Sequence, residues 1–131
     1  MRPIRIERRP FRFSMLYLLL ALAGVVGPVP AHHSFARFDA DRRIELVGTV
    51  KEFQWTNPHV FLELYVIGQD GETVRWLLEG GSPNQLARDG WSRAVMQPGD
   101  KVEVTVSPLK SGKNGGWILK CVLPNGQTLG R

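Results

Sequence analysis

Hydrophobic and polar residues alternate along most of the chain after residue 43, which is typical of β-strands that bury one face. The alternation, with enrichment in β-branched and aromatic residues, predicts five strands, over residues 44–55, 60–67, 73–79, 101–107 and 117–123. Gly48, in the middle of the first strand, indicates a bulge or a sharp bend. Turn-forming residues such as Asn, Asp, Gly and Pro separate the strands.

One short helix is predicted between the third and fourth strands. Ser82 is a good N-cap, Pro83 suits the first helical position, and Gln85 completes a capping box. Gly90 is well placed to end the helix after about two turns.

The predicted fold is all-β with one short helix. Three strands, a helix and two strands follow the element order of the OB-fold, so we expect an OB-fold-like, five-stranded small barrel, with a β-sandwich or another small barrel as the alternative. Strand alternation places Trp76 and Trp117 in the core. It also makes Cys121 a small buried hydrophobic residue, and Met96 is expected to fill a gap in the core.

Residues 1–31 have the order of a signal peptide. Five arginines precede an apolar run over residues 15–26, which is shorter than the roughly twenty residues of a membrane-spanning helix. Small residues before His32 favour cleavage between Ala31 and His32. We therefore expect a periplasmic or secreted protein with no membrane span after cleavage. Arg8 and Arg9 resemble a twin-arginine signal, so the choice between the general and the twin-arginine export route stays open.

Removing this segment changes the charge balance. The chain has 17 basic and 12 acidic residues, but five basic residues and one acidic residue lie in residues 1–31, which leaves 12 against 11. A nearly neutral domain gives no reason to expect a nucleic-acid partner. The remainder is long enough for one domain, which we divide into an N-terminal arm (residues 32–43) and the barrel (residues 44–131). Cys121 is the single cysteine, so no internal disulfide can form.

Several short motifs occur in order along this domain. They are His-His-Ser-Phe at 32–35, Gly-Thr-Val at 48–50, Trp-Thr-Asn-Pro-His at 55–59, Gly-Trp at 90–91 and Pro-Gly-Asp-Lys-Val at 98–102. In these motifs the chain resembles an uncharacterised family of small exported bacterial proteins, a domain of unknown function. The resemblance implies the location and length of the protein but no activity, because that family has no established catalytic residues.

The sequence contains no recognisable catalytic constellation, so we expect a binding protein and not an enzyme. It lacks a His-Glu-x-x-His helix, a nucleophile elbow, a phosphate-binding glycine loop and a Cys-x-x-Cys pair. Trp55 and Trp91 flank turns and are the tryptophans expected to be exposed. One hypothesis is therefore a metal-free module that binds a partner protein or a small ligand through these two aromatic side chains.

The three histidines give the other hypothesis. Cleavage before His32 would create a terminal amine that can chelate a metal ion together with the His32 imidazole. His59, which follows the Asn57-Pro58 turn at the mouth of a strand, is the natural partner, and His33 ranks third. Such a nitrogen-rich set suits divalent copper by geometry and by affinity order. The alternative is that the histidines bind no metal: His32 and His33 form a flexible terminus, and His59 has a capping or core role.

Overall fold

The computed structural model describes residues 35–130, so the expected signal peptide, His32 and His33 lie outside the described residues. The elements in chain order are η2 (Phe35–Arg37), β1 (Ile44–Gln54), β2 (Phe61–Ile67), β3 (Thr73–Glu79), α2 (Pro83–Arg88), β4 (Lys101–Pro108), β5 (Gly115–Val122) and β6 (Thr128–Gly130). Within these residues, no helix has the length and apolar character needed to cross a membrane.

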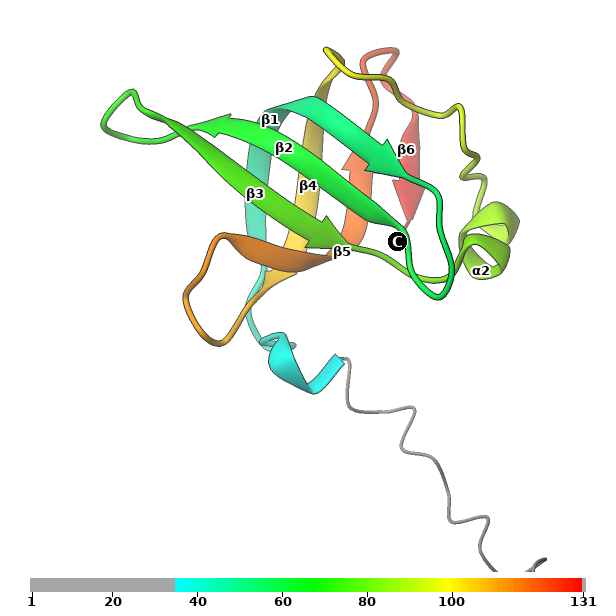
Figure 1. Cartoon of the computed structure of the whole chain (residues 1–131), viewed down its shortest axis with the longest axis horizontal. Coiled ribbons are helices and arrows are strands. Elements are labelled where there is room, and N and C mark those ends of the chain that lie inside the picture. The colour runs from blue at the N-terminus through cyan, green and yellow to red at the C-terminus, as the bar shows by residue number, and fades with distance from the viewer. Residues whose placement is uncertain (1–34, 131) are drawn as a thin grey trace, which may run out of the picture. The chain divides into compact units, whose positions relative to one another are not determined.

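The strands form one closed barrel (Figure 1). Their order is β3-β2-β1-β4-β5-β6, and a parallel pairing of β3 with β5 closes the ring. The expectation of a small five-stranded barrel with one short helix is confirmed. The sixth strand was not predicted: the turn at Pro124–Gly126 does not end the sheet but returns the chain onto β5, with the Leu123 N–H donating to the Gln127 carbonyl at 2.9 Å.

β1 is the strand shared by both sides of the barrel. Its first half pairs with β4 and its second half with β2, and Gly48 pairs with both neighbours. A Cβ at Gly48 would lie 2.9 Å from the Tyr65 carbonyl oxygen, so glycine permits this close backbone approach. The irregularity in the ladder lies two residues further on than expected, between Val50 and Glu52.

A second irregularity, in β5, changes which side chains reach the core. Val106 pairs with Ile118 and Thr105 with Lys120, which leaves Leu119 without a partner on β4. Cys121 is fully buried as predicted, with Ile118 beside it in the core. Trp117, in contrast, is adjacent to Glu79 across the β3–β5 pairing and lies on the outer face of the barrel. The prediction that Trp117 belongs to the core is therefore wrong, because the bulge at Leu119 breaks the alternation.

The rest of the core follows the strand pattern. It is built from alternate aliphatic residues of β1 to β5, and the fully buried ones include Leu62, Leu64, Leu78, Val102, Val104 and Val106. Trp76 packs against this core while remaining partly exposed, and Met96 is buried, as expected.

The helix α2 lies at one end of the barrel (Figure 1). Ser82 caps it, because its Oγ accepts a hydrogen bond from the Gln85 N–H at 3.3 Å. Gly90 follows the helix with φ +87°, a backbone angle that glycine adopts without strain. The chain then turns back, so that the Trp91 N–H donates to the Leu86 carbonyl and the Trp91 side chain enters the core.

Candidate functional site

An aromatic cluster covers the outer face of the barrel where β3 and β5 pair. Trp117 is its centre. The Phe35 ring lies 5.4 Å from the Trp117 ring and the Phe38 ring 5.7 Å from it. The His59 imidazole approaches the same indole edge-on, with ring centroids 5.5 Å apart and an interplanar angle of 89°. Trp117 thus joins the N-terminal arm to the turn that precedes β2.

The described part of the arm is docked on the barrel. Phe38 is buried and forms an isolated bridge with Leu109. The Asp39 N–H donates to the Pro108 carbonyl at 2.8 Å, and the Lys110 N–H donates to the Arg37 carbonyl at 3.0 Å. Backbone hydrogen bonds therefore hold this segment beside the end of β4.

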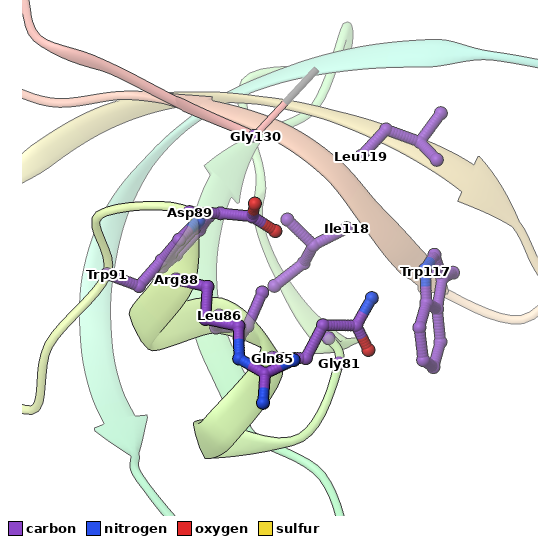
Figure 2. A pocket seen from close by; sticks show the side chains of 11 residues that line it. Gly81, Gln85, Leu86, Arg88, Asp89, Trp91, Trp117, Ile118, Leu119 and Gly130 are labelled. Atoms are coloured by element: carbon purple, nitrogen blue, oxygen red, sulfur yellow. The ribbon is translucent and has the colours of Figure 1, made fainter.

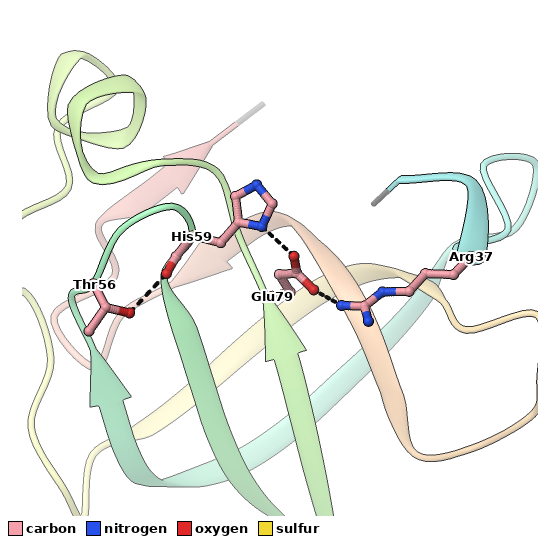
Figure 3. Close-up of polar contacts among 4 residues, drawn as sticks. All are labelled: Arg37, Thr56, His59 and Glu79. Atoms are coloured by element: carbon pink, nitrogen blue, oxygen red, sulfur yellow. Dashed lines mark hydrogen bonds and ion pairs between the residues drawn. The ribbon is translucent and has the colours of Figure 1, made fainter. Parts of the chain in front are cut away.

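Glu79, the last residue of β3, is the buried acid beneath this cluster. Only 6% of its side chain is exposed. Its Oε1 contacts His59 Nδ1, and its Oε2 forms an ion pair with Arg37 Nη2 (Figure 3). A buried carboxylate needs such partners, because the loss of water is otherwise uncompensated.

His59 is held from two directions. Its backbone carbonyl accepts a hydrogen bond from Thr56 Oγ1 at 3.0 Å (Figure 3), and its Nδ1 is engaged by Glu79. About a quarter of the side chain is exposed, at 24%. Nε2 makes no hydrogen bond within residues 35–130 and is the ring nitrogen that remains for a ligand.

The structure places one of the three predicted metal ligands. His59 is as described above, whereas His32 and His33 lie outside the described residues, so their convergence with His59 stays a prediction. In the described part of the chain, no three His, Cys, Asp or Glu side chains are arranged to hold a metal ion.

The two tryptophans expected to be exposed do not form a surface. Trp91 is only 3% exposed, and Trp55 is half-buried against the core. Both rings pack on Phe53, with ring centroids 5.9 Å (Trp55) and 6.2 Å (Trp91) from its centroid. The expected exposure of Trp91 is wrong, because the tight turn after α2 folds this residue back into the barrel end.

Trp91 nevertheless lines a hollow of about 410 Å³ between α2 and β5 (Figure 2). Trp117 stands on its opposite side, and Arg88 and Asp89 are among the residues that line it. Neither of these charged side chains forms an ion pair within residues 35–130. The volume falls in the range of small-molecule sites.

Comparison with known protein families identifies the family of this chain. Residues 20–118 match the model of a family of unknown function, DUF6152. The chain belongs to this family. The resemblance inferred from the motifs to an uncharacterised domain of unknown function is thereby confirmed. The DUF6152 match includes Glu79 and all three histidines and ends at Ile118, in β5.

Other comparisons add little to the DUF6152 assignment. No curated protein matches the chain. Among solved structures, the chain is similar to one described as the crystal structure of the ZRD-deleted mutant of TiaS in complex with agmatine, with 23% sequence identity and a TM-score of 0.44. The match covers 66% of this chain but 22% of that one, so the DUF6152 protein spans only a small part of its length.

Cys121 takes no part in the site of this DUF6152 domain. It is fully buried, and burial raises the pKa of its thiol to about 12, because the thiolate would lose its water. The thiol therefore stays protonated near neutral pH, which is consistent with a packing role.

Sequence reasoning missed Arg37 and Glu79. Glu79 stands at the end of an alternating strand, where acidic residues are common and usually exposed. Its burial depends on Arg37, 42 positions earlier in the chain, and on His59, 20 positions earlier. Strand alternation places Glu79 on the same outer face as the exposed Leu77, so the pattern alone predicts an exposed acid and gives no signal of its burial.

Proposed function

We propose that this DUF6152 protein is exported, is cleaved before His32, and then binds one copper-type divalent ion through the terminal amine and imidazole of His32 together with His59. His33 is a further candidate ligand. The proposed role is binding and not catalysis. The observation that carries the proposal is the contact between His59 Nδ1 and the buried carboxylate of Glu79.

This contact supports metal binding because it orients the ring. Histidines that bind metals usually donate one ring N–H to a carboxylate or carbonyl, which leaves the other nitrogen as the ligand. In this domain Glu79 occupies Nδ1, so Nε2 of His59 would carry the metal. The edge-on contact with Trp117 restricts the imidazole further.

The position of the arm supplies the second support. The rings of Phe35 and His59 both lie within 5.5 Å of the Trp117 ring, so the arm and His59 are neighbours. Residues 32–34 immediately precede Phe35, and three residues of extended chain reach about 10 Å. The short link from His32 to this docked segment is what supports a site shared by His32 and His59.

The chemistry of these donors favours divalent copper. An N-terminal amine and the imidazole of the same residue close a chelate ring, and a further imidazole gives a set of nitrogen ligands. Copper has the highest affinity in the divalent series for such ligands and accepts their tetragonal arrangement.

Copper titration tests the proposal on protein that begins at His32. We expect one tight site with hyperfine structure from several nitrogens in electron paramagnetic resonance spectra. His59→Ala, and a version with one additional N-terminal glycine, should each bind more weakly with altered spectra. Equal affinity and identical spectra for all three proteins would refute the site.

The alternative function is a metal-free module that binds a small ligand or a partner protein. The hollow beside Trp91 and Trp117 favours a small ligand in place of the originally expected surface of Trp55 and Trp91. The additional N-terminal glycine separates the two functions, because it should abolish chelation by His32 but leave this hollow intact.

A further inference from the structure

The hollow between α2 and β5 combines apolar walls with two charged side chains of opposite sign. We infer that it binds a small zwitterion with an apolar body, such as an aromatic α-amino acid. This inference uses none of the proposed metal ligands, so its test is independent of copper binding. It gives the metal-free alternative a class of ligand and assigns roles to Arg88 and Asp89.

The walls of the hollow are largely apolar and partly aromatic. Trp91 and Trp117 lie on opposite sides of it, and Leu86 also lines it (Figure 2). Gly81 is a further lining residue, at which a Cβ would lie 3.1 Å from Gln85 Oε1 and 3.6 Å from the Leu86 side chain. Glycine therefore leaves space at this point. These walls favour a ligand with an apolar or aromatic group, which they would remove from water.

The two charges come from the C-terminal end of α2. Arg88 is the last residue of the helix and Asp89 is its C-cap, and both are exposed and line the hollow. Within residues 35–130 they form no ion pair, either with each other or with another side chain. A ligand with a single charge would meet one attractive and one repulsive side chain. A ligand with an ammonium and a carboxylate group would find an opposite charge for each, which favours a zwitterion.

Trp91 contributes a hydrogen-bond donor to the same hollow. Its Nε1 is buried and has no acceptor within residues 35–130. Buried N–H groups are normally paired, because an unpaired donor loses its hydrogen bonds to water without replacement. The nitrogen has almost no exposed surface, so a ligand oxygen reaches it through a small movement of a lining side chain. This donor and Arg88 both favour a carboxylate in the ligand.

Three related compounds test the charge pattern on protein kept metal-free with a chelator. Phenylalanine carries both charges, phenylpropanoate lacks the ammonium group, and phenylethylamine lacks the carboxylate. Isothermal titration calorimetry should show one site that binds phenylalanine about tenfold more tightly than either analogue, because each analogue loses one charged hydrogen bond. No saturable binding of phenylalanine at millimolar concentration, or equal affinity for all three compounds, would overturn the inference.

Two substitutions assign each charge to a group of the ligand. Arg88→Gln should weaken the binding of phenylalanine and phenylpropanoate about tenfold without weakening that of phenylethylamine. Asp89→Asn should weaken the binding of phenylalanine and phenylethylamine without weakening that of phenylpropanoate. Equal weakening of all three compounds by each variant would refute the charge pairing.

Matched controls are available on the N-terminal arm. Arg43→Gln and Asp41→Asn remove the same charges at exposed positions that do not line the hollow and form no ion pair within residues 35–130. Both should bind all three compounds as the wild type does, and thermal unfolding checks that every variant is folded. A loss of affinity in these controls equal to that in the α2 variants would mean that net charge and not the hollow determines binding.

Nuclear magnetic resonance locates the bound compound. The indole N–H signals of Trp91 and Trp117 should shift when phenylalanine is added, whereas that of Trp76, which does not line the hollow, should stay in place. Replacement of each tryptophan by phenylalanine assigns the signals. If phenylalanine binds while the Trp91 and Trp117 signals stay unchanged, the compound lies elsewhere and the site is refuted.

Discussion

Trp117 and Cys121 lie four residues apart in β5 and face opposite sides of the barrel. Cys121 is fully buried in the core, whereas Trp117 stands on the outer face beside Glu79. The unpaired Leu119 between them shifts the register against β4 by one residue. This bulge supplies the aromatic surface on which the arm and His59 rest, so an irregularity of the ladder creates the candidate site.

Glu79→Gln tests the carboxylate that orients His59. Glutamine keeps the shape of the side chain but removes its charge, so the contacts with His59 and Arg37 weaken while the backbone pairing of β3 remains. We expect copper affinity to fall about 10- to 100-fold, measured by competition with a chelator of known affinity. Glu45→Gln, at an exposed position of β1, is the control and should bind as the wild type. Unchanged affinity in Glu79→Gln would argue against His59 as a ligand oriented by this acid.

Trp91→Ala should destabilise the protein strongly. The side chain is 3% exposed and packs in the core, so its removal leaves a large cavity at a cost of about 3–5 kcal/mol. Urea unfolding followed by circular dichroism measures this cost. Trp55→Ala should cost less, because Trp55 is only half-buried. A stable Trp91→Ala protein that has lost a binding activity would instead support an exposed working role for this tryptophan.

Alkaline pH should destabilise the protein partly through Cys121. Burial raises its thiol pKa from an ordinary 9.0 to about 12, so the unfolded chain loses this proton at a lower pH than the folded chain. The stability that the protonated thiol gives to the folded protein is therefore fully present below pH 9. As the pH rises toward 12, the free energy of unfolding falls by up to about 1.4 kcal/mol per pH unit. The free energy of unfolding should fall less steeply in Cys121→Ala over this range. Parallel pH profiles for the two proteins would contradict the prediction.

Gly48→Ala should distort the shared strand of the barrel. The added Cβ would lie 2.9 Å from the Tyr65 carbonyl oxygen and 3.1 Å from the Val66 side chain, and the backbone oxygen cannot move away independently. We expect a loss of about 1–3 kcal/mol in the free energy of unfolding. Thr49→Ala, one residue along the same strand, should cost less. Equal costs would mean that β1 and β2 separate easily at this point.

Strand alternation was sufficient to predict the barrel and most of its core. β3 was predicted with its observed bounds, and β2 and β4 to within one residue, because each is a regular strand with one aliphatic face. β6 was missed because three residues after a turn carry no measurable period. The orientation of Trp117 was predicted wrongly for a different reason: a one-residue bulge leaves no mark in the hydrophobic pattern.

The candidate site could be predicted only in part. His59 was identified from its place after a turn, which is a local feature of the sequence. Arg37 and Glu79 were not, because the contact between them depends on a long-range pairing of the arm with the barrel. The burial of Trp91 likewise results from the path of the chain after α2, which propensity does not specify.

The shared carboxylate of Glu79 also has an evolutionary consequence. Glu79 contacts both Arg37 and His59. The contribution of each of the three side chains to the site therefore depends on the presence of the other two. Within the DUF6152 family, positions 37, 59 and 79 are therefore expected to covary. A relative without an acidic residue at position 79 should also lack an arginine at position 37. Family alignments in which the two positions vary independently would show that the arm and the histidine are maintained for separate reasons.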